Sequence, residues 1–117
     1  MLSLIGKDIY LPRGDTGKLR ITINSSYTAD SGDRILFTVK RDGYPVIIRV
    51  MTPVNNQAVV EFTNEMTKNL AVGDYRYDIR FIRDATVDSQ GIPTDGVGVD
   101  TPMREATFHL MNTVGDV

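Results

Sequence analysis

The chain has no cysteine among its 117 residues and contains a single histidine. The absence of cysteine excludes disulfide bonds, thiolate metal sites and thiol catalysis. One imidazole leaves little scope for histidine-based metal or acid–base chemistry, so we expect no enzyme activity, no metal and no cofactor. No apolar run exceeds three residues, which excludes a transmembrane helix, and the first residues lack the basic and apolar regions of a secretory signal. We therefore expect a protein that is made in the cytoplasm and does not insert into a membrane.

The charge is divided unevenly along a chain whose length fits one domain over residues 1–117. Residues 1–50 carry eight Lys or Arg against five acids, a balance of +3, and residues 51–83 carry four of each. Residues 84–117 carry one Arg against six acids, a balance of -5. Such asymmetry is typical of oppositely charged faces that meet in an assembly, or of charges that intermingle within one fold. No dense basic stripe is present, so we expect no nucleic-acid partner.

Hydrophobic and polar residues alternate along most of the chain, which is the pattern of half-buried strands. We expect strands at 8–11, 18–24, 35–40, 46–51, 57–62, 74–83 and 104–111. The alternation directs these side chains inward: Leu19, Ile21, Ile23, Ile35, Phe37, Val39, Ala58, Val60, Phe62, Tyr75, Tyr77, Ile79, Phe81, Ala106, Phe108 and Leu110. Strands with short connections and no sustained helix predict an all-β fold, an antiparallel β-sandwich.

Local signals mark the connections between these strands. Asp42-Gly43 lies between two apolar runs and predicts a two-residue hairpin turn, and Asn55-Asn56 predicts a second turn. The alternation stops between 63 and 70, where we expect a short helical turn over about 64–70 with Thr63 or Asn64 as the N-cap.

Tyr75 lies just after Gly73, at the start of the long strand at 74–83. Sandwich domains often have a tyrosine corner at this place, with the ring packed inside and the hydroxyl bonded to the backbone. Tyr77 takes the inward position at which an antibody domain has its second cysteine. The alternative is that both are ordinary members of a strand that favours aromatic residues.

Residues 84–102 show no period and contain three glycines, two prolines and four aspartates. A loop of this length in a compact domain is usually functional or disordered. We expect an arm that emerges at one end of the sandwich, binds a partner and becomes ordered on docking. Its candidate binding residues are Asp84, Asp88, Asp95 and Asp100. Their spacing does not match the pattern of a calcium-binding loop, so we expect no metal there.

Two further features have a structural and a functional interpretation. Arg13-Gly14-Asp15-Thr16 contains the tripeptide of integrin ligands, but that role needs an exposed loop in an exported protein. We expect a structural turn before the strand at 18–24, with Gly14 at positive φ and Asp15 bonded to the backbone. His109 is the one candidate general base, and the alternation turns it outward as an exposed strand residue.

Four motifs follow one another in a specific order: Arg-Gly-Asp-Thr at 13–16, Leu-x-Ile-x-Ile at 19–23, Phe-Thr-Val-Lys at 37–40, and Gly-Asp-Tyr-Arg-Tyr-Asp-Ile at 73–79. Over roughly residues 8–112 the chain resembles the N-terminal immunoglobulin-like domain of phage baseplate upper proteins and related tail-fibre-associated virion proteins. The resemblance implies an immunoglobulin-like sandwich with a non-catalytic role, present in many copies in a virion. The sequence departs from the family in its long acidic loop and in ending at Val117, because baseplate members continue into a further domain.

We therefore expect a structural protein of a phage or prophage virion, at the tail or baseplate, the neck or the fibre-attachment region. Its expected partners are other virion proteins and copies of itself, which it meets through strand edges, the 84–102 arm and the terminal tails. Three alternatives remain: a capsid decoration protein, a bacterial adhesin, and a module that contacts host-surface glycans through Tyr10, Tyr27 or Tyr44.

Overall fold

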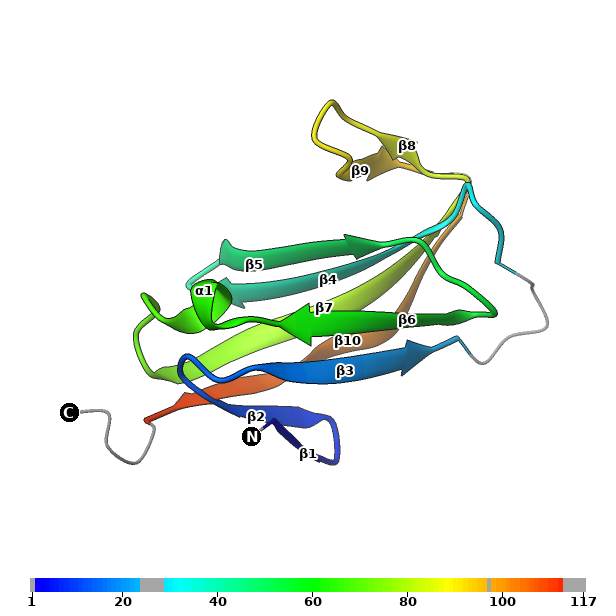
Figure 1. The fold of residues 1–117 in the computed structure, drawn as a ribbon. Coiled ribbons are helices and arrows are strands. Elements are labelled where there is room, and N and C mark those ends of the chain that lie inside the picture. Colours follow the sequence, from blue (N-terminus) through cyan, green and yellow to red (C-terminus); the bar gives the residue numbers. More distant parts are fainter. Residues whose placement is uncertain (1, 24–28, 97, 113–117) are drawn as a thin grey trace.

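The computed structural model describes residues 2–23, 29–96 and 98–112, and this part of the chain is all-β (Figure 1). The all-β prediction is therefore confirmed. The described residues form ten strands and one short helix: β1 (Ser3–Ile5), β2 (Asp8–Pro12), β3 (Gly17–Thr22), β4 (Arg34–Arg41), β5 (Tyr44–Met51), β6 (Gln57–Phe62), α1 (Asn64–Thr67), β7 (Gly73–Arg83), β8 (Thr86–Val87), β9 (Pro93–Asp95) and β10 (Gly98–Met111).

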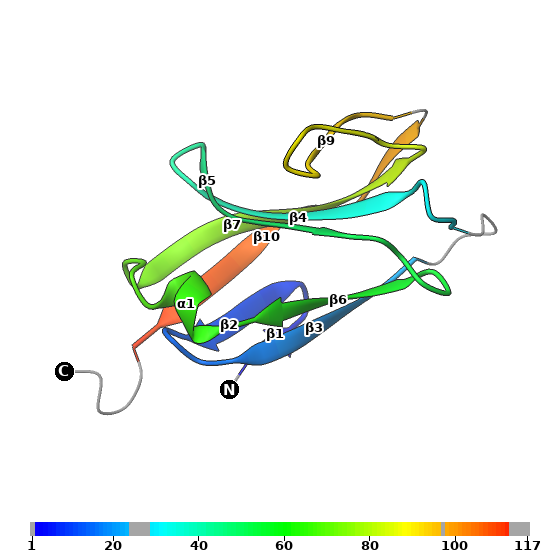
Figure 2. The same cartoon turned by 45° about the horizontal axis from the view of Figure 1, so that its top comes forward.

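The strands make one large sheet and two small ones. The large sheet has the order β1-β2-β10-β7-β4-β5, while β3 pairs with β6 and β8 pairs with β9. Figure 2 shows the β3–β6 pair facing the large sheet, with α1 at one end. The prediction of a purely antiparallel arrangement is wrong, because β2 runs parallel to β10, with Ile9 opposite Phe108. These two strands are distant in sequence, so no hairpin forces them to be antiparallel.

The hydrophobic core lies between the two layers. Every residue predicted to point inward is buried except Ile23, which packs partly buried against the others. Among the described strands, no ladder joins β3 or β6 to the large sheet. Side chains therefore hold the layers together, among them the fully buried Phe62 at the end of β6. Its ring centroid is 5.8 Å from that of Phe37 on β4 and 5.8 Å from that of Phe108 on β10.

The predicted turns are confirmed. Asp42 and Gly43 have φ of 53° and 81°, and Asn55 and Asn56 have φ of 52° and 58°. Both central residues of each turn are thus left-handed, as type I′ hairpins require. The helical turn is also confirmed, with Thr63 in extended conformation at the N-cap of α1. No helix in the described ranges is long and apolar enough to span a bilayer.

The prediction of an irregular loop over 84–102 is wrong. β8 and β9 form a hairpin, and β10 begins at Gly98, where it pairs with the end of β7. Two register shifts, from Asp100 to Met103 and from Met103 to Ala106, accommodate Pro102 inside the strand. Proline has no N–H to give to a ladder and is tolerated where a strand bulges. Of the residues that predicted a loop, Gly91 lies in the hairpin turn and Pro93 on β9, whereas Gly98 and Pro102 belong to the irregular strand β10.

Candidate functional site

The β8–β9 hairpin is anchored at its base by Asp33, whose side chain is fully buried. Its Oδ1 accepts a hydrogen bond from the Asp84 N–H at 2.9 Å, and its Oδ2 accepts one from the Asp30 N–H at 2.8 Å. Beside them, the Ala85 N–H donates to the Gly32 carbonyl at 2.8 Å. Asp33 thus joins the segment before β4 to the end of β7, at the point where the hairpin leaves the large sheet.

Asp88 shapes the turn of this hairpin. Its Oδ1 accepts hydrogen bonds from the N–H groups of Gln90 at 2.8 Å and Ile92 at 3.0 Å. The Asp88 N–H donates to the Ile92 carbonyl at 2.9 Å, and Gly91 takes a φ of 81°. These hydrogen bonds all lie within one chain and define the turn of the hairpin. Next to the turn, Val87 is 40% exposed.

The structure does not gather the four predicted binding aspartates into one site. Asp84 lies at the base of the hairpin and Asp88 at its turn, and both are exposed. Asp95 lies on β9 and Asp100 on β10, with side chains outside the described part of the structure. Asp84 instead forms an acidic group with two aspartates from the segment before β4. The carboxylate oxygens of Asp30, Asp33 and Asp84 lie within 4.8 Å of one another.

No local pattern in the sequence points to this acidic group, because Asp33 and Asp84 are 51 residues apart. Its buried member already accepts two backbone N–H groups, and Asp30 accepts a third from Gly32 at 2.8 Å. The group therefore acts as a backbone clamp.

The Arg13–Thr16 segment forms a turn that is held against α1. The Gly14 N–H donates to Oγ1 of the buried Thr67 at 2.8 Å, and the Asn64 side-chain amide donates to the Gly14 carbonyl at 3.0 Å. Gly14 has a φ of 83°, and a Cβ at this position would lie 3.0 Å from the Asn64 amide nitrogen. The Asp15 N–H closes the turn on the Pro12 carbonyl at 3.0 Å. The segment thus joins the two layers at one end of the molecule.

Tyr75 lies buried at the start of β7, and its hydroxyl donates to the Ala71 carbonyl at 2.6 Å. A hydrogen bond to the backbone a few residues upstream is the defining contact of a tyrosine corner. The Arg41 guanidinium covers the ring, 4.8 Å from its centroid, and donates to the hydroxyl at 3.3 Å. Gly73 has a φ of 138°, and a Cβ there would lie 3.0 Å from the same guanidinium. Arg41 and Gly73 are therefore parts of this corner.

His109 faces outward from β10, as the alternation predicts, but its side chain is only 22% exposed. Its ring stacks on Tyr10 with the centroids 4.2 Å apart and the planes within 9°. Nδ1 lies 2.6 Å from Asp74 Oδ1, and Nε2 lies 3.5 Å from Asp8 Oδ2. The description of His109 as an exposed strand residue is therefore wrong, because three side chains from β2 and β7 surround it.

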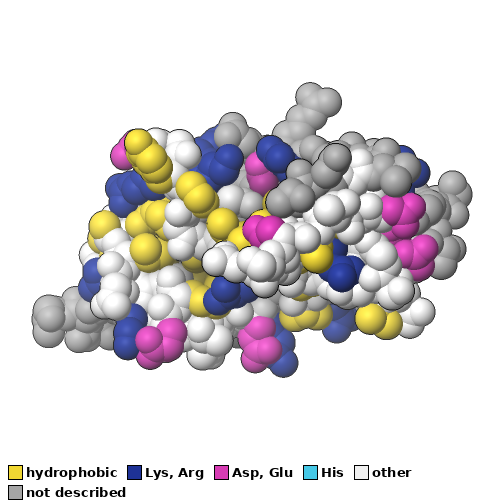
Figure 3. Space-filling view, turned by 90° about the horizontal axis from the view of Figure 1, so that it is seen from above, with side chains coloured by type: hydrophobic (Ala, Val, Ile, Leu, Met, Phe, Trp, Pro, Cys, Tyr) yellow, Lys and Arg dark blue, Asp and Glu magenta, His cyan; other side chains and the backbone are white. Residues whose placement is uncertain are grey.

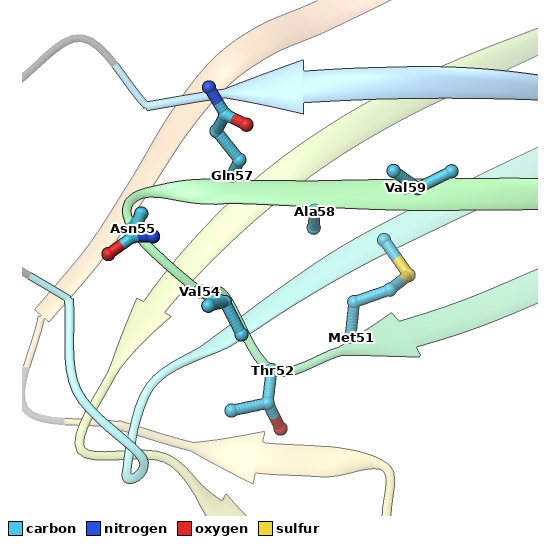
Figure 4. Close-up of a pocket in the computed structure, with 7 residues that line it drawn as sticks. All are labelled: Met51, Thr52, Val54, Asn55, Gln57, Ala58 and Val59. Atoms are coloured by element: carbon cyan, nitrogen blue, oxygen red, sulfur yellow. The ribbon is translucent and has the colours of Figure 1, made fainter.

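The two layers leave two open sides, and the first lies between β5 and β6. Figure 4 shows the groove there, lined by Met51, Val54, Asn55, Gln57, Ala58 and Val59. Val54 is 69% exposed and Val59 43%. Figure 3 looks onto β5 and shows hydrophobic side chains gathered over the β4–β5 hairpin, with Lys and Arg side chains among them. Exposed hydrophobic side chains on this side of the molecule therefore lie among polar and basic ones.

The second open side holds a pocket of about 220 Å³ between the β1–β2 hairpin and β3. Tyr77 and Ile79 of β7 contribute to its lining, together with Leu4, Ile21, Lys7 and Arg20. The Tyr77 hydroxyl donates to the Lys7 carbonyl, which closes the hairpin onto β7. Among the described residues, no carboxylate lines the pocket. We refer to it below as the basic pocket.

Burial raises the pKa of the Tyr77 phenol above its ordinary value of 10.0, and the nearby Asp8 carboxylate raises it further. A raised pKa in the folded state means that ionisation favours the unfolded chain, so this contribution to stability is complete below pH 10 and is lost as the pH rises above it. We predict that the urea midpoint of the unchanged chain falls as the pH rises above about 10, and that the midpoint of Tyr77→Phe falls less steeply. Tyr44→Phe, at a 74% exposed ring, is the matched control. Equal slopes for Tyr77→Phe and the unchanged chain would contradict the prediction.

Comparison with known protein families and with curated proteins finds no match for this chain. Most of the polar side chains described above hold strands and turns in place, whereas apolar side chains are left uncovered at the open sides of the sandwich.

Proposed function

We propose that this chain is a non-catalytic structural component of a phage or prophage virion that assembles in many copies at the tail or baseplate, the neck or the fibre-attachment region. The observation that supports this proposal most directly is the position of the exposed apolar residues. Most of the large ones are on strands at the edges of sheets: Leu4 and Ile5 on β1, Tyr44 and Val46 on β5, and Val59 on β6. Exposed edges with apolar side chains pair or aggregate unless another chain covers them, so this surface suits a protein that works in an assembly.

The immunoglobulin-like class of the sandwich is part of this proposal. Three features support it: the two layers, the parallel pairing of β2 with the last strand β10, and the hydrogen bond from the Tyr75 hydroxyl to the Ala71 carbonyl. The resemblance to the N-terminal domain of baseplate upper proteins implies an immunoglobulin-like sandwich as well. A rigid sandwich that presents hairpins and edges is a suitable joint between larger parts of a particle.

A non-catalytic role is supported by the state of the one imidazole. The ring of His109 is stacked on Tyr10, and both of its nitrogens face carboxylates that belong to neighbouring strands. Within the described residues, neither of the two hollows described above is lined by histidine, aspartate or glutamate. A general base must reach the proton that it abstracts, whereas here Nδ1 of the candidate base contacts Asp74 and the Nε2 atom is buried.

The glycan-binding alternative finds less support in the geometry. Tyr10 lies on β2 and Tyr44 on β5, which are separated by three strands of the large sheet, and the Tyr10 ring already stacks on His109. Tyr27 lies outside the described residues. The two described candidates therefore do not form a shared aromatic platform.

Interruption of the gene in the host that produces the particle tests this proposal. We expect incomplete particles by electron microscopy and restored assembly when the unchanged chain is supplied from a plasmid. Supply of the Phe62→Ala chain is the matched control, since it tests whether the folded domain is needed. Normal particles and normal titre without the chain would overturn the proposal. Intact particles that lack only surface copies of the chain would replace it with a capsid decoration role.

A further inference from the structure

We propose that the β8–β9 hairpin of one copy docks into the basic pocket of a second copy, so that the chains join head to tail. The inference rests on the proposed function, because it presumes that the chain assembles in several copies. It adds which surfaces meet and how the assembly grows. The hairpin is defined here as residues 84–96, and the pocket as the hollow between the β1–β2 hairpin and β3.

The basic pocket combines an apolar interior with a positively charged rim. Leu4 is 54% exposed at its wall, and Ile5 beside it is 66% exposed. Lys7 and Arg20 both line the pocket and are both exposed. An apolar hollow flanked by cations fits an apolar side chain with a carboxylate next to it, because the first fills the hollow and the second complements the rim.

The hairpin offers this combination. Val87 is exposed on β8, and the exposed Asp88 follows it directly. Residues 84–96 contain three aspartates and no Lys or Arg. The hydrogen bonds of Asp88 and Asp33 form the hairpin and fix its base before any contact is made. A preformed loop loses less conformational entropy on binding, which favours such a contact.

The two surfaces lie on opposite sides of one molecule. In Figures 1 and 2 the β8–β9 hairpin projects beyond the β4–β5 side, whereas β1 and β2 lie at the other edge of the large sheet. The hairpin therefore cannot reach the pocket of its own chain. Contact between two different surfaces is heterologous, and repetition of it produces either a closed ring or an open filament. Residues 1–50, which include most of the pocket, have a charge balance of +3, and residues 84–117 have a balance of -5. This difference in charge favours contact between the hairpin of one copy and the pocket of the next.

Sedimentation equilibrium over a range of concentrations tests the contact. We expect the unchanged chain to grow beyond a dimer, and higher salt to weaken the association because the charged rim is screened. Val87→Ser should weaken association about tenfold, and Lys7→Glu with Arg20→Glu by at least as much. The matched control for Val87→Ser is Val54→Ser, which changes an exposed valine on the other open side. The matched control for the double variant is Lys18→Glu with Arg49→Glu, which changes the net charge equally at exposed positions outside the pocket. Circular dichroism establishes that each variant is folded.

Mixing the two defective variants gives the sharper result. Val87→Ser keeps an intact pocket, and the Lys7→Glu, Arg20→Glu variant keeps an intact hairpin. At a concentration where each is monomeric alone, the mixture should form one-to-one heterodimers and stop there. Three results would each overturn the proposal. The mixture could stay monomeric, or the variants could assemble like the unchanged chain. The unchanged chain could also be monomeric at concentrations on the order of 1 mM. None of these outcomes removes the role in the particle, which the gene interruption tests separately.

Discussion

Replacement of Phe62 by alanine should destabilise the protein by about 4 kcal/mol, because it removes a fully buried ring and leaves a cavity. The ring contacts Phe37 and Phe108 of the large sheet, so it packs the β3–β6 pair against that sheet. No ladder of the described strands joins these layers, and the hydrogen bonds of Gly14 to α1 hold them at one end only. Urea unfolding followed by circular dichroism measures the change. A domain of this size has a total stability of about 5–15 kcal/mol, so much of it depends on this ring.

Two further variants separate the role of the ring from a general sensitivity of β6. Phe62→Leu keeps an apolar side chain and should lose about 1 kcal/mol. Val59→Ala changes an exposed residue of the same strand and should stay within about 0.5 kcal/mol of the unchanged chain. If Phe62→Ala costs no more than Phe62→Leu, side-chain packing at this position does not hold the layers together.

Replacement of Asp33 by alanine should cost about 3 kcal/mol, because the N–H groups of Asp30 and Asp84 lose the buried carboxylate that accepts from them. Asp33→Asn keeps the shape and one acceptor oxygen, so about half of that loss is expected. The damage should be local as well as global. Amide exchange at Asp84 and Ala85 should accelerate more than exchange in β4, since Asp33 fixes the base of the hairpin.

Glu61→Gln is the matched control for Asp33→Asn, because it removes the same charge from an exposed position on β6. We expect its stability to change by less than about 0.5 kcal/mol. Unchanged exchange at Asp84 in the Asp33→Ala protein would show that the clamp does not fix the hairpin. The same variant should also weaken self-association, since a loosened hairpin must be ordered again on docking.

The elements that the sequence predicts correctly are those encoded by neighbouring residues. Alternation identified most of the core, with only Ile23 among the predicted residues outside the buried class, but it did not single out Ile9, Leu11 and Ile47. Asp42-Gly43 and Asn55-Asn56 specify their turns because these residues tolerate a positive φ. Thr63 likewise marks the start of α1. Each of these signals acts within a few residues and does not depend on the rest of the fold.

The errors concern contacts between distant residues. Pro102 looked like the end of a loop, but a bulge against β7 holds it within β10. The parallel pairing of β2 with β10 and the clamp of Asp33 on Asp84 join segments that no local pattern connects. His109 was placed on the correct face of its strand, yet its neighbours Tyr10 and Asp74 come from two other strands. The candidate surfaces for assembly belong to this second class, because they appear only when strands are placed side by side.

The copy number of the chain per particle is the most direct test of the proposed structural role. Purified particles, washed in high salt and digested, can be quantified by mass spectrometry against isotope-labelled peptides of this chain and of the major particle protein. We predict several copies per particle, in a number that is constant between preparations and insensitive to washing. Fewer than one copy per particle, or a number that falls with each wash, would contradict the account.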